Sequence, residues 1–201
     1  MNNETTTEDQ IFEAARSVFH EQGLGGARMQ EIARRAGINQ SMLHYYFRSK
    51  AKLFDAVFEK AIGEALPPVL TILRSDTPLL EKISLFVASY LGMLGRNPHL
   101  PGFILEELRR SPDRIREIVG QRAEGVFSVF KSQVESAVAS GEIRPIAAEH
   151  LFANMLSLCV FPFVARPMLQ TVMGLEDDGY DIILEERTNV VTSFIFNAVK
   201  P

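Results

Sequence analysis

The sequence predicts an all-α fold, and three observations lead to this prediction. Apolar residues recur at spacings of three and four along almost the whole 201-residue chain, which is the period of an amphipathic helix. No stretch sustains an alternation of apolar and polar residues, and no Asn-Gly pair signals a hairpin. Gly37 lies between two short segments of helical period, an arrangement that is typical of two helices joined by a tight turn.

The N-terminal part of the chain predicts three short helices. Gly23 and Gly37 are expected to end the first two, because glycine readily adopts the backbone conformation that follows a helix C-terminus. Asn39 is a favourable N-cap for the third helix, since its side chain can accept a hydrogen bond from the first turn. These helices are expected at about residues 7–23, 27–37 and 39–47.

The rest of the chain predicts longer helices. Ser49 is expected to cap a fourth helix that stops at Pro67-Pro68, where N–H groups are missing and proline rings clash with the preceding turn. Ser111-Pro112 is expected to open a long helix, because proline is favourable in a first turn. The later helices are expected at about residues 77–95, 101–110, 111–141, 147–161 and 181–199.

Positive charge is concentrated in residues 28–52. This segment holds six basic residues and the single acid Glu31, a net charge of +5, in a chain whose formal net charge is −4. The remainder of the chain therefore carries −9, so the basic segment predicts one local face for phosphates on an acidic body. The six basic residues are Arg28, Arg34, Arg35, Arg48, Lys50 and Lys52.

Several classes of protein have no signature here. The chain has one cysteine, Cys159, no metal-ligand spacing, no Gly-rich phosphate loop and no nucleophile elbow. Glu106 and Glu107 are adjacent on an expected helix and do not face each other, so solvated pairs such as Glu106 with Arg109 or Arg110 are favoured over a catalytic pair. No apolar run is long enough to cross a bilayer and no secretory signal is visible. We therefore expect a cytoplasmic protein that is not an enzyme and uses no cofactor or metal.

The third expected helix has two different faces. At about 100° per residue, Leu43, Tyr46 and Phe47 share one side, which can pack on the stripe of the second helix. The opposite side carries hydrogen-bonding and aromatic groups that fit the major groove of DNA. The same apolar pattern would also fit any small helical bundle. The groups on this outer side are Ser41, His44 and Tyr45, with Gln40 at its edge.

These outer groups match the chemistry of DNA. The Gln40 amide can pair with adenine through two hydrogen bonds, and Ser41 can reach either base type. His44 and Tyr45 can contact phosphates or a thymine methyl group. The helix N-terminus at Asn39 offers free N–H groups for a phosphate, and Arg48 and Lys50 lie where the flanking backbone would pass.

Residues 8–57 resemble the N-terminal domain of TetR-type transcriptional regulators. The resemblance rests on the stretch ARMQEIARRAGINQSMLHYYFRSKAKLF, with its Ala-x-x-Ala-Gly-Ile turn, its Tyr-Phe pair and the following Ser-Lys. It implies DNA binding, with Gln30, Gln40, Ser41 and His44 facing bases and with Tyr45 and Lys50 on phosphates.

Three positions depart from the family pattern. His44 stands where tyrosine is common, and Met42 stands where a small or hydroxyl residue is usual. The second helix lacks the usual phosphate-binding threonine near its start, so Arg28 is expected to take over that contact. These departures concern individual DNA contacts rather than the way the module docks.

The resemblance also implies roles for the two parts of the chain. Residues 1–52 would form the helix-turn-helix DNA-binding domain, and residues 53–201 a helical domain for ligand binding and for homodimerisation through the last two helices. The expected activity is that of a repressor released from a palindromic double-stranded DNA operator by a small apolar or aromatic effector. The candidate effector-binding residues are Phe86, Tyr90, Met93, Phe103, Phe127, Phe130, Met155 and Phe161.

Other interpretations stay open at this point. Rings at helical spacing are also what a plain core shows, and the last two helices could bury against their own subunit. A helical-bundle carrier or enzyme for an apolar small molecule, without a DNA role, fits the C-terminal part. An activator, or a regulator that uses no small ligand, fits the N-terminal part equally well.

Overall fold

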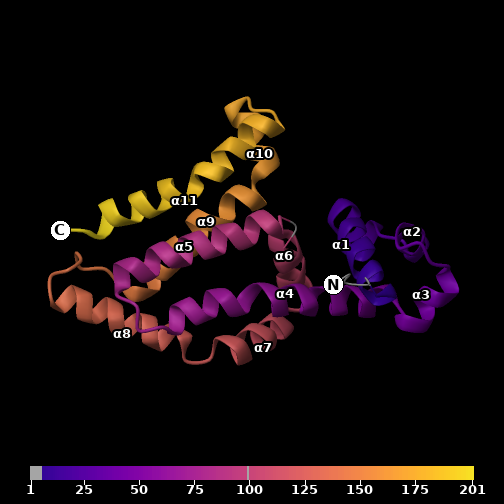
Figure 1. The fold of residues 1–201 in the computed structure, drawn as a ribbon, viewed down its shortest axis with the longest axis horizontal. Helices are drawn as coiled ribbons and strands as arrows, with labels where there is room; N and C mark the ends of the chain where they lie inside the picture. Colours follow the sequence, from indigo (N-terminus) through magenta and orange to yellow (C-terminus); the bar gives the residue numbers. More distant parts are fainter. Residues whose placement is uncertain (1–5, 99) are drawn as a thin grey trace, which may run out of the picture. The chain divides into compact units, whose positions relative to one another are not determined.

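The computed structural model describes residues 6–98 and 100–201, and in these residues it contains helices and no strand. The predicted all-α fold is therefore confirmed (Figure 1). The helices are α1 (Thr7–Gly26), α2 (Met29–Arg35), α3 (Gln40–Tyr46), α4 (Lys50–Arg74), α5 (Leu79–Arg96), α6 (Leu100–Arg110), α7 (Pro112–Ala123), α8 (Val126–Ala139), α9 (Ala148–Val164), α10 (Arg166–Met173) and α11 (Asp177–Val199).

The described chain divides into two compact units. One contains the residues up to Glu64 and the other begins at Ala65, so the division falls within α4. The boundary expected after residue 52 falls within the same helix, close to its start. Because α4 is continuous across both positions, neither composition nor a loop marks where the first unit ends.

The first unit has a core of aromatic and aliphatic side chains. Ile11, Val18 and Phe19 of α1 are buried, and the Phe19 ring meets the Phe54 ring of α4 edge to face, with centroids 5.2 Å apart. Gly23 leaves the helical conformation with φ +64°, as expected, but one further turn carries α1 on to Gly26. The fourth helix thus closes the same core as the first two, which is why α4 begins in this unit.

The helix α4 passes through Pro67 and Pro68, so the expected stop at these residues is wrong. Continuing the helix buries Val69 and Leu73 in the second unit, and this packing offsets the missing backbone donors. The helix ends instead just before Ser75, whose N–H bonds to a carbonyl of the last turn.

A buried lysine fastens the end of α4. The side chain of Lys82, on α5, is fully buried, and its Nζ donates to the carbonyl oxygens of Leu73 at 2.9 Å and Ser75 at 2.6 Å. Burial lowers the pKa of Lys82, and the nearby Asp76 carboxylate opposes this effect. The lysine therefore satisfies carbonyls that the helix end leaves without partners.

Two expectations for the middle of the chain are wrong. The long helix expected over residues 111–141 is two helices, α7 and α8, separated at Gly125, which has φ +72°. The expected solvated pair of Glu106 with Arg110 does not form, because Arg110 pairs at 2.8 Å with Glu107, which is fully buried and also pairs with Arg114 at 3.4 Å. The charge-rich stretch thus has an internal ion-pair cluster where α6 packs on α7.

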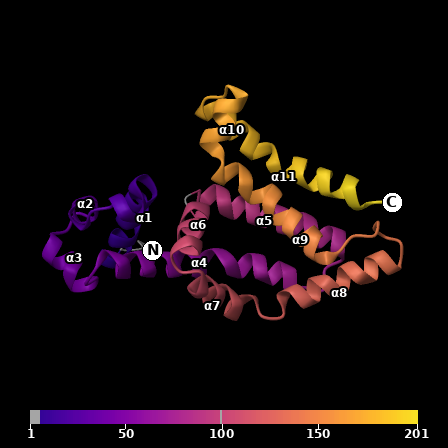
Figure 2. The same ribbon diagram turned by 180° about the vertical axis from the view of Figure 1, so that it is seen from behind.

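The second unit is built around α5. Figure 1 shows α11 running alongside α5, and Figure 2, the view from behind, shows α9 next to α5; the helices α5, α9 and α11 pack on one another. The axes of α9 and α10 meet at a bend of 75°. None of the described helices is by itself long and apolar enough to cross a membrane. The bent pair of α9 and α10 reaches the length and apolar composition of a membrane span only when the two helices are taken together.

Candidate nucleic-acid interface

The turn between α2 and α3 has the geometry of a tight helix end. The Ile38 N–H donates to the Ala33 carbonyl at 3.0 Å, and the Gly37 N–H donates to the Arg34 carbonyl at 3.2 Å. Gly37 has φ +71°, a conformation that strains residues with a Cβ. This pair of hydrogen bonds is the Schellman arrangement, so the sequence specifies the angle at which the chain enters α3.

The helix α3 is capped and anchored as its sequence predicts, with one exception. The Met42 N–H donates to Asn39 Oδ1 at 2.8 Å, and the Leu43 side chain is completely buried. Phe47, just after the helix, is half-buried and packs edge to face on Phe12, with ring centroids 5.8 Å apart. Tyr46 was expected on this inner face, but 43% of it is exposed, because the helix ends there and the inner face is already filled by Leu43 and Phe47.

The outward face of α3 is open. Tyr45 is 84% exposed, and Gln40, Ser41 and His44 are exposed beside it. Gln40 Nε2 and His44 Nε2 lie 3.4 Å apart, one helical turn from each other, so the two side chains can act on neighbouring groups. The exposed Arg28, Gln30 and Asn39 were also predicted to contact DNA, from the start of α2 and the turn.

Part of the basic segment is internally neutralised. Arg34 pairs with Glu31 at 2.7 Å, and the Arg35 guanidinium bonds both Glu31 and Glu21. The Arg35 and Ser17 hydrogen bonds lower the pKa of Glu21 to about 2, and the Arg34 and Arg35 hydrogen bonds lower the pKa of Glu31 to about 2. Arg35 therefore joins α1 to α2, whereas Arg34 is neutralised within α2, and neither arginine offers free charge.

Three other cations keep their charge available. Arg28, Arg48 and Lys52 have no acidic partner among residues 6–98 and 100–201. They lie before α2 and after α3, at the two sides of the outward face in the sequence. The positive charge left for phosphates is therefore smaller than the composition implies, and it flanks the Gln40–Tyr45 surface.

Lys50 has a structural role that the sequence did not reveal. Its Nζ donates to the carbonyl oxygens of Gly25 at 3.0 Å and Ala27 at 2.8 Å. The lysine thus ties the start of α4 to the chain that leaves α1, and at most one of its three N–H groups stays free for a phosphate. The sequence feature nearest to this contact is Gly25-Gly26, two residues without side chains that could cover the backbone carbonyls.

Most of the predicted effector-binding residues lie in the interior of the second unit. Phe86, Met93, Phe103, Phe130 and Met155 are buried, whereas Tyr90 and Phe127 are half-buried. The rings of Phe86, Phe127 and Phe130 gather around Phe152, a residue the sequence did not single out, and Tyr90 stacks on Phe86. These five rings form one aromatic cluster in the second unit.

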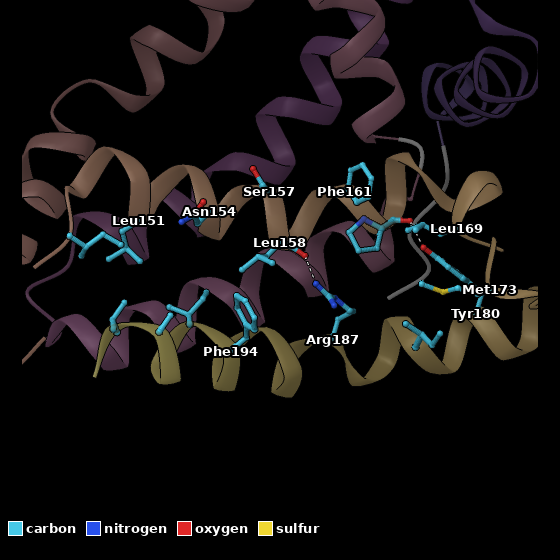
Figure 3. A pocket seen from close by; sticks show the side chains of 16 residues that line it. Leu151, Asn154, Ser157, Leu158, Phe161, Leu169, Met173, Tyr180, Arg187 and Phe194 are labelled. Atoms are coloured by element: carbon cyan, nitrogen blue, oxygen red, sulfur yellow. Dashed lines mark hydrogen bonds between the residues drawn. The ribbon is translucent and has the colours of Figure 1, made fainter. Parts of the chain in front are cut away.

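Phe161, the last of the predicted effector-binding residues, lies elsewhere. It is 51% exposed and lines an open groove of about 590 Å³ formed by α9, α10 and α11. Figure 3 shows Leu158 and Phe161 of α9 across the groove from Arg187 and Phe194 of α11. The groove arises between helices far apart in sequence, so helical periodicity alone could not reveal it.

The described residues show no metal-binding arrangement. No group of three or more His, Cys, Asp or Glu side chains among them could hold a metal ion. Cys159 is fully buried in α9, as expected of a core residue, and desolvation raises the pKa of its thiol to about 12. The thiol is therefore protonated at neutral pH.

The sequence is similar to those of known bacterial regulatory proteins. The sequence profile described as "Bacterial regulatory proteins, tetR family" matches residues 11–57, which span α1 to the first part of α4. The fatty acid metabolism regulator protein of Bacillus subtilis is 22% identical over 174 residues, covering 87% of each chain. The HTH-type transcriptional repressor NicS of Pseudomonas putida is 27% identical over 180 residues, covering 85% of this chain and 82% of that protein.

One solved structure has a similar fold over nearly the whole chain. A mutant HlyIIR protein superposes with a TM-score of 0.67 at 22% identity, covering 96% of this chain and 97% of that one. The likeness therefore extends over both compact units and includes the C-terminal helices, for which the sequence pattern is much less specific.

Proposed function

We propose that the chain, whose residues 11–57 match the tetR-family profile, is a DNA-binding transcriptional regulator of that type and acts as a repressor that binds a palindromic operator as a homodimer. The observation that carries the proposal is the outward face of α3. Gln40, Ser41, His44 and Tyr45 are exposed there and take no part in the core. Leu43 anchors the helix, so these four exposed side chains are not needed for packing and can contact DNA.

We assign the DNA contacts by position and chemistry. Gln30, Gln40, Ser41 and His44 face base edges in the major groove, where amide and hydroxyl groups discriminate between base pairs. Tyr45, the N–H groups at Asn39, and the unpaired cation of Arg28 contact phosphates and position the module. Lys50 contributes to DNA binding mainly by fixing α4, with one N–H left for a phosphate.

The homodimer would form through the last two long helices. Apolar side chains project from this part of the second unit into solvent, which is costly for a chain that stays monomeric. Two copies related by a two-fold axis would bury them and present two α3 helices to half-sites about 34–36 Å apart. The exposed residues are Phe161, Val164, Met168, Val172, Met173, Ile182, Val190 and Phe194.

Release from DNA would follow binding of a small apolar or aromatic effector within the second unit. The aromatic cluster around Phe152, with the half-buried Tyr90 at its side, supports this choice of chemistry. The effector would bind more tightly to a conformation with a different spacing of the two α3 helices, and this difference in affinity would lower the affinity for DNA. Such a protein acts in the cytoplasm, where the DNA is.

Gel-shift titration on the DNA upstream of the protein's own gene tests the proposal. We expect a complex that depends on sequence and weakens steeply as salt rises, because bound phosphates release counterions. A reporter fused to the same DNA should be more active when the protein is deleted. A sequence-independent complex would contradict DNA recognition by α3, and a reporter that is less active after deletion would identify an activator.

A further inference from the structure

The helix α3 has a polar flank and an apolar flank on the two sides of its outward face. At about 100° per residue from the buried Leu43, Gln40 and His44 lie on one side. These two residues form the polar flank, and their Nε2 atoms are 3.4 Å apart. Met42 and Tyr46 lie on the other side, form the apolar flank, and are 42% and 43% exposed. The DNA contacts proposed so far use the polar flank and leave the apolar flank without a role.

The chemistry of Met42 restricts what it can contact. Its backbone N–H already donates to Asn39 Oδ1 at 2.8 Å, and its thioether has no hydrogen-bond donor. Met42 therefore has no free N–H or O–H group to offer to a phosphate. Its exposed side chain is flexible and apolar, so it gains free energy mainly by leaving water against another apolar group.

The ring of Tyr46 extends this apolar surface by one helical turn. Residues four positions apart are neighbours on the surface of a helix, so Tyr46 lies next to Met42. The Tyr46 ring also meets the Tyr45 ring edge to face, with centroids 5.8 Å apart. A single exposed apolar side chain is ordinary on a protein surface. Two neighbouring ones, continuous with a face that is free to contact DNA, indicate that the DNA offers an apolar group at this flank.

Thymine supplies such a group in the major groove. The edges of the bases present hydrogen-bond donors and acceptors there, and thymine alone among the four bases adds a methyl group. The sugar carbons of the backbone are also apolar, but they are the same at every position and carry no sequence information.

We infer that Met42 is a specificity-determining residue that packs against a thymine methyl group and thereby selects thymine at one position of each operator half-site. This inference rests on the proposed function, in which α3 enters the major groove. Tyr46 borders the same methyl group from the next helical turn. The polar and apolar flanks of α3 then read different features of the bases, the first by hydrogen bonds and the second by apolar contact.

Exchange of thymine for uracil tests the inference, because uracil pairs with adenine in the same way and lacks only the methyl group. The probe is the duplex that the full-length wild-type protein selects most strongly from randomised sites. Uracil replaces the thymines of both half-sites, one symmetry-related pair of positions at a time, and fluorescence anisotropy measures the affinity. At one such pair we expect uracil to weaken wild-type binding by about ten-fold, since burial of a methyl group contributes about three- to four-fold in each half-site.

The variants assign the methyl contact to one side chain. Met42→Ala should bind the thymine and the uracil duplex equally at that pair of positions. Met42→Leu keeps an apolar side chain of similar volume and should keep most of the uracil effect. Gln40→Ala, on the polar flank, is the matched control and should keep the whole effect. Both side chains are exposed, so the variants should fold, and circular dichroism checks that they do.

Three results would overturn the inference while leaving DNA recognition intact. The first is a selected duplex without a thymine in each half-site, or one in which uracil has no effect at any position. The second is a uracil effect that Met42→Ala retains, as expected if Tyr45 or His44 contacted the methyl group. The third is an equal loss of affinity for all duplexes in Met42→Ala, as expected if Met42 packed on sugar carbons. A wild-type protein that selects no sequence at all would instead overturn the proposed function, and the inference with it.

Discussion

Replacing Lys50 with alanine should have two effects that can be measured independently. The substitution removes the charge-assisted hydrogen bonds from Nζ to Gly25 O and Ala27 O. Hydrogen bonds to charged groups contribute about 1.5–3 kcal/mol each when well shielded. One of these bonds is exposed and the other is only partly buried, so we expect a loss of about 1–3 kcal/mol in the free energy of unfolding.

The effect of Lys50→Ala on DNA should be uniform across sequences. A lysine that positions α4 and offers one N–H to a phosphate does not read bases, so affinity for specific and non-specific DNA should fall together. The slope of log K against log salt should become less steep by about one unit or less for the lost phosphate contact.

Lys52→Ala is the matched control, because it also removes one positive charge, two residues further along α4. The Lys52 side chain is exposed and has no acidic partner among the described residues. Urea unfolding and fluorescence anisotropy on labelled DNA measure the two effects. If Lys50→Ala unfolds at the same urea concentration as Lys52→Ala, the two carbonyl contacts do not stabilise the domain. If it changes sequence preference, Lys50 reads bases and our assignment of α3 and α4 is wrong.

Four further predictions concern recognition, the turn and pH. Gln40→Ala should cost about 1–3 kcal/mol on the operator and relax preference at one base position, as measured by selection from randomised sites, while Gln22→Ala on α1 should leave it unchanged. Gly37→Val should lower the free energy of unfolding by about 1–2 kcal/mol or more, because φ is +71° there, and wild-type stability would show that the turn is not strained. Gly120→Ala, inside α7 with open space around its Cβ and no positive φ, should instead raise stability by about 0.5–1 kcal/mol in chemical unfolding; a loss would contradict the helical assignment there. The pKa values of Glu21 and Glu31 are lowered to about 2 from 4.5, so their contribution to the free energy of unfolding is complete above pH 4.5 and is lost as pH falls toward 2. In acid unfolding followed by circular dichroism, Glu31→Gln should lose less stability over this pH range than the wild type does. An unchanged profile would contradict the pairing of Glu31 with Arg34 and Arg35.

The local signals for the first unit predicted most of its backbone. Gly23, Gly37 and Asn39 each have one conformational or capping role that depends on neighbouring residues alone, and the structure places them in those roles. Leu43 was predicted as the inner contact of α3 by helical period, and it is fully buried. Tyr46 was not predicted correctly, because periodicity does not show where a short helix runs past the surface that it packs on.

The second unit depends on contacts that local patterns do not contain. Pro67 and Pro68 were expected to stop α4, yet burial of Val69 and Leu73 keeps the helix continuous. The single helix expected over residues 111–141 is divided at Gly125, where the backbone leaves the helical conformation between α7 and α8.

The candidate sites divide in the same way. The outward residues of α3 follow from one helix and its period, so they could be assigned from sequence. The groove depends on the approach of α9 to α11, two helices that are far apart in the sequence. Sequence alone offered no means of bringing these two helices together.

Footprinting of the upstream DNA tests the central claim most directly, by comparing wild type with the double variant Gln40→Ala/His44→Ala. Both side chains are exposed and lie outside the core, so the variant should fold normally. The account predicts a two-fold symmetric footprint whose half-site centres are one DNA turn apart, about 10–10.5 base pairs, or a multiple of that. It also predicts that the double variant loses this footprint while keeping weak, salt-sensitive binding to any DNA. A wild-type footprint that the double variant reproduces unchanged would contradict recognition by the outward face of α3.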